Sequence, residues 1–231
     1  AGMNPTVTLS AQSLNEPTLK AVERHNIDFD NLEELRDSYQ AAGLFTYTDI
    51  ILGLPEETLS SFLQGLSRTM SSRLTDLVAI YPALMIESAE MNSKKSREEY
   101  QFETRLCPQT WRFQPLDLEA ETEYEELVVS TRTMPPEDWK KAYLYSRMVW
   151  GFFFGRVGFF VTCYLKVILK VDPMDFIVFL VEEGQKHKHK YARLNKAICH
   201  AIKQCDIILQ NGPQLNTLED YGPIAFTPHE A

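Results

Sequence analysis

Short β-rich runs alternate with helical stretches over the first ninety residues, and this alternation constrains the fold more than any other feature of the chain. The helical stretches are amphipathic, and one of them, over 30–43, ends at a glycine, Gly43. Strands separated by helices of this length form βαβ crossovers in a parallel sheet. We therefore predict three adjacent parallel strands that carry helices on one face only. The predicted strands are residues 7–13, 46–53 and 76–83.

The second part of the chain has a different pattern. A charged stretch and an acidic one lead to a possible strand over 126–134, and a helical run follows through 137–170. The last twenty residues contain several glycines and prolines, which are typical of an irregular tail. The sequence thus predicts a β/α part over residues 1–92 and a mainly helical part over 93–231, with a short irregular or strand segment near 117–134.

Charge and cysteine usage exclude several classes of function. The formal net charge is −9 at pH 7, which disfavours nucleic acid as a partner. The four cysteines form no paired framework, and the start shows no secretory signal, so the sequence predicts a cytoplasmic protein. Histidine and cysteine spacings fit no metal site. The run 148–165 approaches the length of a membrane span, but Arg156 lies in its middle. We predict that this run packs against the protein, with Arg156 reaching a carboxylate or a carbonyl.

A carboxylate, Asp49, stands within the second predicted strand, which ends at Gly53 before a leucine and a proline. Ligands of parallel β/α folds sit at the carboxyl ends of the strands. A buried carboxylate is costly unless something hydrogen-bonds it, and a ribose diol would do so. Gly53 would let the backbone approach a flat ligand. Equally, Asp49 can be a satisfied structural carboxylate beside a simple strand-to-helix turn. The residues alone leave both interpretations open.

Two motifs at these positions resemble the later half of the radical S-adenosylmethionine (SAM) enzyme core. The first is Ser-x-Gln-Ser at residues 10–13, followed one helix later by Arg24, and the second is Asp-x-Ile-x-Gly-Leu-Pro-x-x-Thr at 49–58. Glu56 departs from the family, which usually has glycine there. The resemblance implies an α/β fold, namely the C-terminal half of a parallel (β/α)6 partial TIM barrel, followed by a mainly α-helical region.

The resemblance also implies roles for individual residues. In the oxygen-independent coproporphyrinogen oxidase branch of the superfamily, the matching glutamine, arginine and aspartate contact the ribose and the carboxylate of SAM, and the matching isoleucine packs on adenine. The third strand would add further adenine contacts. The SAM-binding residues implied for this chain are Gln12, Arg24, Asp49, Ile51, Gly53, Tyr81 and Pro82.

A narrower resemblance covers residues 124–152, which are similar to the region after the barrel in cobalamin-binding radical SAM proteins, many of them methyltransferases. Such an enzyme uses SAM, a 4Fe-4S cluster and cobalamin. This chain has neither the Cys-x-x-x-Cys-x-x-Cys loop for the cluster nor a cobalamin motif. We therefore expect it to be the C-terminal segment of a longer enzyme, inactive without the N-terminal part of the same protein.

The substrate, a small molecule or a peptide, cannot be read from the sequence. Two alternatives remain open: a radical SAM enzyme of another reaction class, and a non-catalytic β/α module that binds a nucleoside.

Overall fold

Three parallel strands form the central sheet of the computed structural model, which describes residues 6–26, 29–72, 77–108, 123–211, 214–218 and 222–226. The strands are β1 (Thr6–Thr8), β2 (Phe45–Leu52) and β3 (Leu77–Pro82), in the order β1-β2-β3. Both neighbouring pairs are parallel, as the alternation predicted. The first strand is shorter than expected, because its run continues only as an isolated bridge between Gln12 and Ile50.

The two faces of this sheet differ in burial. In β2 and β3 the even-numbered side chains are buried and the odd-numbered ones are not, since successive residues of a strand point to opposite faces. Ile50, Leu52, Val78 and Ile80 belong to the main core, together with side chains of the helices. The arrangement is compatible with part of an α/β barrel whose odd-numbered face stays open. The six β/α units that the family resemblance implies stay a prediction.

Local signals explain where the first helices begin and end. They are α1 (Glu16–Ala21), α2 (Phe29–Ala41) and α3 (Leu59–Ser71). Gly43 adopts a φ of 74° just after α2, the left-handed conformation that stops a helix. Thr58 caps α3 and exchanges hydrogen bonds with Ser61 in a capping box. The end of α2 before Gly43 agrees with the helix expected over 30–43.

An antiparallel pair follows the sheet and was only half expected. It consists of β4 (Glu103–Pro108) and β5 (Tyr124–Ser130), and η1 (Glu90–Asn92) and α4 (Lys94–Tyr100) precede it. β5 also pairs with the chain that leaves β3: Val128 N–H donates to Ala83 O at 2.8 Å and Met85 N–H to Glu126 O at 2.8 Å. This pairing joins the hairpin to the parallel sheet.

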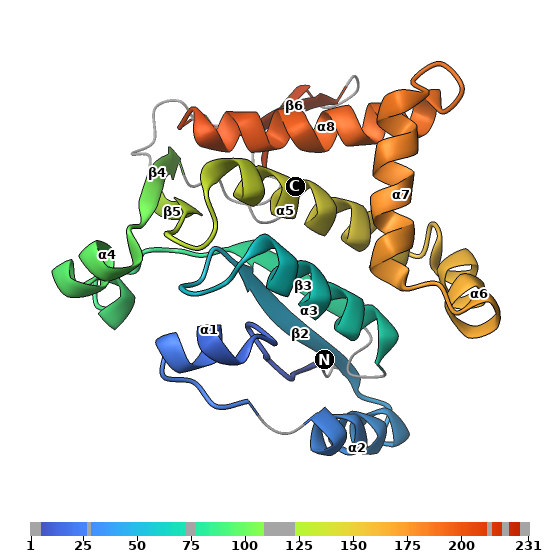
Figure 1. Ribbon diagram of the computed structural model, residues 1–231, viewed down its shortest axis with the longest axis horizontal. Helices are drawn as coiled ribbons and strands as arrows, with labels where there is room; N and C mark the ends of the chain where they lie inside the picture. The colour runs from blue at the N-terminus through green and yellow to red at the C-terminus, as the bar shows by residue number, and fades with distance from the viewer. Residues whose placement is uncertain are drawn as a thin grey trace.

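Helices dominate the rest of the chain (Figure 1). α5 and α8 lie side by side and α7 crosses their ends, and β6 and β7 pair as an antiparallel hairpin where an irregular tail was expected. One core cluster reaches from Ala11 to Ile208, so both parts of the chain share it. The elements are α5 (Pro136–Val149), η2 (Trp150–Phe154), α6 (Phe159–Leu169), α7 (Pro173–Lys186), α8 (Ala192–Leu209), β6 (Gln214–Leu218) and β7 (Gly222–Phe226).

The apolar run 148–165 is bent rather than straight. The π-helical turn η2 ends at Gly155, and α6 leaves at 90° to α5 and η2. Arg156, with a φ of 65°, lies over the ring of Phe159 at 4.2 Å. The predicted contact of Arg156 with a carboxylate or carbonyl is therefore wrong, because the bend places the guanidinium on an aromatic face instead.

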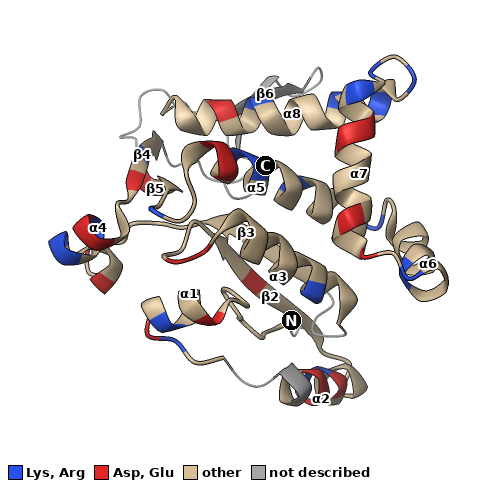
Figure 2. Ribbon diagram, viewed as in Figure 1, with Lys and Arg blue, Asp and Glu red and all other residues tan. Residues whose placement is uncertain are grey.

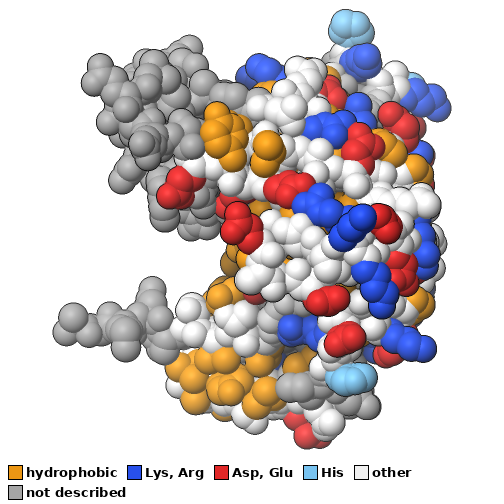
Figure 3. Space-filling model, turned by 90° about the vertical axis from the view of Figure 1, so that its left-hand side faces the viewer, with side chains coloured by type: hydrophobic (Ala, Val, Ile, Leu, Met, Phe, Trp, Pro, Cys, Tyr) orange, Lys and Arg blue, Asp and Glu red, His pale blue; other side chains and the backbone are white. Residues whose placement is uncertain are grey.

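Packing of this run is also less complete than predicted. Phe153 and Phe154 are buried, whereas Val157 and Phe160 are 78% and 81% exposed. Among the described residues, no single helix is long and apolar enough to cross a membrane; only the bent pair passes that test, on length and composition alone. Figure 3 shows the molecule hollowed on one side, with hydrophobic side chains gathered below the hollow and charged ones over much of the remaining described surface.

Candidate functional site

Asp49 is the only charged residue in the three parallel strands. It lies opposite Ala79 in β3 and belongs to the odd-numbered residues, which form the open face of the sheet. Figure 2 shows the acidic segment of β2 that contains it. Within the described part of the chain, no side chain or backbone group hydrogen-bonds its carboxylate. Partial burial raises the pKa of Asp49 above its ordinary value, and no described cation offsets this. A half-buried carboxylate without a partner is a group that a ligand can satisfy.

Gln12 lies beside β2, the strand that carries Asp49. Its N–H donates to Asp49 O and its carbonyl accepts from Ile51 N–H, both at 2.7 Å. Its φ of 59° is left-handed, which is uncommon for a residue with a side chain. The alternation of side chains between the two faces of the sheet is therefore broken at Gln12. The direction of its half-buried side chain does not follow from the alternation along β1. Strained backbone of this kind gathers at ligand sites.

Arg24 reaches back to the end of β1, as its position one helix later suggested. Its guanidinium donates from Nη2 to Ser10 O at 2.6 Å and from Nε to Asn26 Oδ1 at 3.3 Å. Asn26 in turn donates to Ser13 O at 2.8 Å. Within the part of the chain that the structure describes, Arg24 forms no ion pair with Asp49. The arginine thus holds the loop that carries Gln12, and its remaining donors are open to a ligand.

The three residues expected to contact adenine lie at the end of β2 and β3. Ile51 and Tyr81 are opposite each other in the register and both are half-buried. Ile51 packs against a small cluster that includes Leu54 and Met85. Pro82 is buried on the other face of β3. The geometry places Ile51 and Tyr81 on the face of Asp49, and Pro82 away from it.

Gly53 has a structural task that its sequence context did not reveal. Its φ of 96° is left-handed, and a Cβ there would lie 3.3 Å from Val128 O and 3.4 Å from Trp139 Nε1. Trp139 is fully buried, and its Nε1 has no hydrogen-bond partner among the described residues. The backbone therefore approaches β5 and α5 at Gly53, where a flat ligand had been expected.

Sequence reasoning missed Glu57, a carboxylate that is 2% exposed. Ser13 Oγ donates to its Oε2 at 2.5 Å and Ser61 Oγ to its Oε1 at 2.6 Å. Burial raises the pKa of Glu57, while these hydrogen bonds oppose the rise. Glu57 thus ties the loop after β1 to the start of α3. The pair of glutamates after Pro55 could have indicated a buried carboxylate. The same pair is equally typical of the acidic first turn of a helix, so the sequence does not distinguish the two.

An ion pair links the loop after β2, which carries Glu56 and Glu57, to the residues that follow β5. Glu56 adopts a φ of 59°, at the position where the family usually has glycine. Its carboxylate forms an ion pair with Arg132, whose guanidinium also lies over the Tyr100 ring at 5.5 Å. The loops after β1, β2 and β5 therefore form one connected rim at the carboxyl end of the sheet, beside Gln12 and Arg24.

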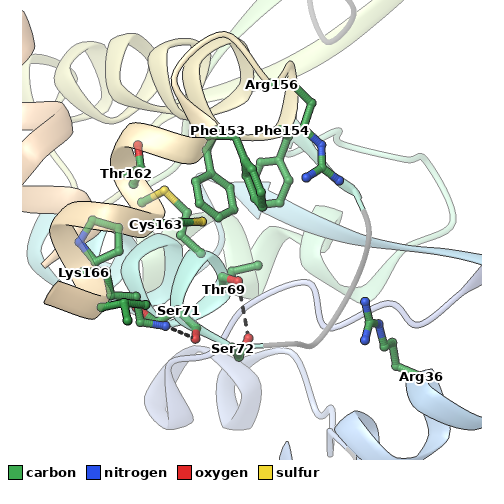
Figure 4. A pocket seen from close by; sticks show the side chains of 14 residues that line it. Arg36, Thr69, Ser71, Ser72, Phe153, Phe154, Arg156, Thr162, Cys163 and Lys166 are labelled. Carbon is green, nitrogen blue, oxygen red and sulfur yellow. Dashed lines mark hydrogen bonds between the residues drawn. The ribbon is translucent and has the colours of Figure 1, made fainter. Parts of the chain in front are cut away.

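A cavity of about 450 Å³ lies at the other end of the sheet, between the end of α3 and the bend before α6 (Figure 4). Arg36, Arg156 and Lys166 border it. Each already has a partner: Asp37 at 2.8 Å, the Phe159 ring and Ser71 O, respectively. Its cations are therefore engaged by the fold, and none of the predicted site residues lines it.

The cysteines do not form a cluster site. Cys107 and Cys205 are buried, and burial raises the pKa of their thiols to about 11 and about 12. No group of three or more histidine, cysteine or acidic side chains within the described ranges could hold a metal ion. The thiolates that an iron–sulfur cluster requires are thus not brought together by this part of the chain.

Comparison with known proteins supports the motif resemblance. No family model matches the chain. It is 31% identical over 142 residues, 62% of this chain, to the cobalamin-dependent radical SAM methyltransferase TokK of Streptomyces tokunonensis. It is 26% identical over 159 residues, 69% of this chain, to a 2-(S-pantetheinyl)-carbapenam-3-carboxylate methyltransferase of Streptantibioticus cattleyicolor.

These matches cover 21% and 23% of the two relatives, so the chain spans about a fifth of the length of the curated relatives it matches. The recognition from the motifs is confirmed at this level. Over more than half of its residues, this chain is a homologue of a segment of a cobalamin-dependent radical SAM methyltransferase.

Proposed function

We propose that this chain forms the SAM-binding β/α portion of a cobalamin-dependent radical SAM methyltransferase. The observation that carries the proposal is Asp49, a half-buried carboxylate without a described partner on the open face of the sheet. Similarity to a methyltransferase of this type supports the same assignment. The open face of the sheet and the rim of loops beside it support this location for SAM, and the homology supports the class of enzyme.

Each residue near Asp49 has a separate task under this proposal. Asp49 and Gln12 accept and donate hydrogen bonds at the ribose diol, and Arg24 binds the carboxylate of SAM with the donors that Ser10 and Asn26 leave open. Ile51 and Tyr81 provide apolar surface for adenine from adjacent strands. Gly53 and Pro82 shape the strand ends from the buried side.

The bound cofactors would supply a hydrogen-abstracting radical and the methyl group. This chain's own residues bind and orient SAM and exclude water from its apolar side. The cysteines do not fit a 4Fe-4S cluster, so no step is assigned to one here. Under the proposal, the thiolates that hold the cluster and the residues that hold cobalamin lie outside these 231 residues.

Calorimetric titration of SAM into the protein and its Asp49→Asn variant tests the assignment. Loss of a charged hydrogen bond should weaken binding by about 1–3 kcal/mol. Asp175→Asn, at an exposed position of α7, removes the same charge away from the sheet and should leave SAM affinity unchanged. Equal affinity of the protein and Asp49→Asn would exclude Asp49 as a SAM ligand.

A non-catalytic nucleoside-binding module is the second candidate, because the chain brings no three thiolates together. Adenosine distinguishes the two. A SAM site uses Arg24 for the amino-acid carboxylate, so Arg24→Gln should weaken binding of SAM and not of adenosine. Equal loss for both ligands would favour the nucleoside module. A radical SAM enzyme of another reaction class would bind SAM in the same way but transfer no methyl group from cobalamin.

A further inference from the structure

A second cavity, of about 550 Å³, lies between the end of α5 with η2 and the first half of α8. None of the residues predicted to bind SAM lines it. Its volume falls within the range of about 300–1,000 Å³ that small-molecule sites occupy. The lining is mostly apolar, with Trp150 and Phe152 on one wall, Val157 at the bend and Ala197 on α8.

Basic side chains border this apolar cavity on one side. Arg193, Lys196 and His200 follow each other at intervals of three and four residues, which places them on one face of α8. Arg147 borders the cavity from α5. Among the described lining residues there is no aspartate or glutamate, although the whole chain carries a formal net charge of −9. Positive charge is thus concentrated locally against the overall balance.

Two of these cations are not engaged by the fold. Neither Arg193 nor Lys196 forms an ion pair or a hydrogen bond with any residue that the structure describes. Lys140 of the neighbouring α5, by contrast, pairs with Asp206 at 3.0 Å. Arg193 and Lys196 thus lack the carboxylate partner that Lys140 has, and their charges remain available to a ligand.

We propose that this cavity binds an amphipathic organic anion, with its apolar body against Trp150 and Phe152 and its carboxylate or phosphate head at Arg193 and Lys196. Apolar surface supplies the affinity and the cations select the charge. The site is separate from the open face that carries Asp49, and it requires no property of the proposed SAM site.

Titration calorimetry with octanoate, octyl phosphate, 1-octanol and inorganic phosphate tests both halves of the proposal. We expect octanoate or octyl phosphate to bind once per chain, about tenfold more tightly than octanol, because only the anions gain the attraction of two exposed cations. The tighter of the two anions identifies the head group. Octanol binding as tightly as both anions, or inorganic phosphate binding as tightly as octyl phosphate, would overturn the assignment.

Variants place the ligand in the cavity. The double variant Arg193→Gln with Lys196→Gln should weaken binding of the octyl anion about tenfold. The matched control, Lys188→Gln with Lys203→Gln, removes two exposed cations that do not line the cavity and should leave binding unchanged. Equal losses in the two double variants would mean that only overall charge matters, and would refute the site.

Gly151 gives a second, steric test. It lines the cavity, and a Cβ added there would meet no atom within 4 Å. Gly151→Leu should therefore fill the cavity and abolish binding of the octyl anion while the melting temperature stays the same or rises. A folded Gly151→Leu protein that binds octanoate or octyl phosphate as before would place the ligand elsewhere and contradict the proposal.

Discussion

At the scale of single residues, two side chains in the site region are kept in unfavourable states. Asp49 holds a carboxylate in a partly buried position without a described partner, and Glu56 holds a left-handed backbone without being glycine. Asp49 lies within β2, on the open face of the sheet, and Glu56 lies in the loop that follows this strand. Both kinds of unfavourable group are common at functional sites, and the binding role proposed for this region would account for them.

The cost at Asp49 predicts a pH-dependent effect of Asp49→Asn. A raised pKa means that the folded protein holds the proton more tightly than the unfolded chain, whose value is near 3.8. The associated stability is therefore present below that pH and is lost as pH rises through the pKa of the folded state. Thermal unfolding should show Asp49→Asn more stable than the parent protein at pH 7, and the advantage should vanish below about pH 4. An advantage of the same size at both pH values would point to packing instead.

Glu56 offers a test of backbone strain against an ion pair. Glycine at this position should relieve about 1 kcal/mol of left-handed strain, while loss of the partly exposed pair with Arg132 costs about 0.2–1 kcal/mol. Glu56→Gly should therefore be nearly neutral in the parent protein and stabilising in an Arg132→Gln background. Urea unfolding of the four proteins measures this, and the same change in both backgrounds would show that the pair contributes nothing.

At the scale of helices and strands, the sequence predicted the elements whose signals are local. The parallel strands and the C-terminal end of α2 follow from alternating apolar runs and a stop glycine. β4 was missed because its polar sequence, ETRLCP, is stabilised by pairing with β5, a segment that comes later in the chain. The bend before α6 was missed although its contacts are local: Arg156 lies over Phe159, and a Cβ at Gly155 or Gly158 would come within 2.7 Å of Gly151 O or of the Phe152 ring.

The same limit applies to the candidate site. Motifs placed Gln12, Arg24 and Asp49 at neighbouring strand ends, and the structure puts Gln12 next to Asp49 with Arg24 above the end of β1. Their role in binding SAM stays a prediction. Glu57 could not be predicted, because its partners Ser13 and Ser61 become known only when the loops are in place.

Gly53 and Gly43 form a matched pair for separating strain from packing. Both have left-handed φ values, 96° and 74°, but a Cβ meets tightly packed atoms only at Gly53. Gly43→Ala should cost about 1 kcal/mol for strain alone, and Gly53→Ala about 2–3 kcal/mol because Val128 and Trp139 must also move. Denaturant unfolding measures both. Equal costs would mean that the approach of β5 to Gly53 is looser than the structure describes.

The buried Glu57 connects two loops, and its removal should loosen both. Glu57→Ala leaves the hydroxyls of Ser13 and Ser61 without their acceptor, which should cost about 1–3 kcal/mol. Amide hydrogen exchange should quicken in the loop after β1 and in the first turn of α3, and not in α8. Faster exchange throughout the protein would indicate global destabilisation and no specific tie.

At the scale of the whole molecule, one core cluster joins the β/α part to the helices. The predicted division into two parts at residue 92 therefore does not separate two independent cores, and it stays a prediction. Charge is distributed unevenly over this body. Acidic side chains dominate overall, whereas the cavity beside α8 is bordered by cations. The open face of the sheet and this cavity thus offer two chemically different surfaces, one with an acceptor for hydroxyl groups and one with donors for an anion.

The distribution of cysteines over the fold predicts the outcome of iron–sulfur reconstitution. Cys107 lies in β4, Cys163 in α6, and Cys199 and Cys205 in α8; only Cys199 is exposed. A 4Fe-4S cluster needs several thiolates at one point, and burial of Cys107 and Cys205 raises the pKa of their thiols and disfavours thiolates. Anaerobic incubation of the 231-residue chain with iron and sulfide should therefore leave no stoichiometric iron after desalting.

The variant Cys199→Ser is the control for iron that binds loosely at the exposed thiol. About four irons per chain, with a broad visible charge-transfer band that survives in Cys199→Ser, would show that the fold assembles a cluster site after all.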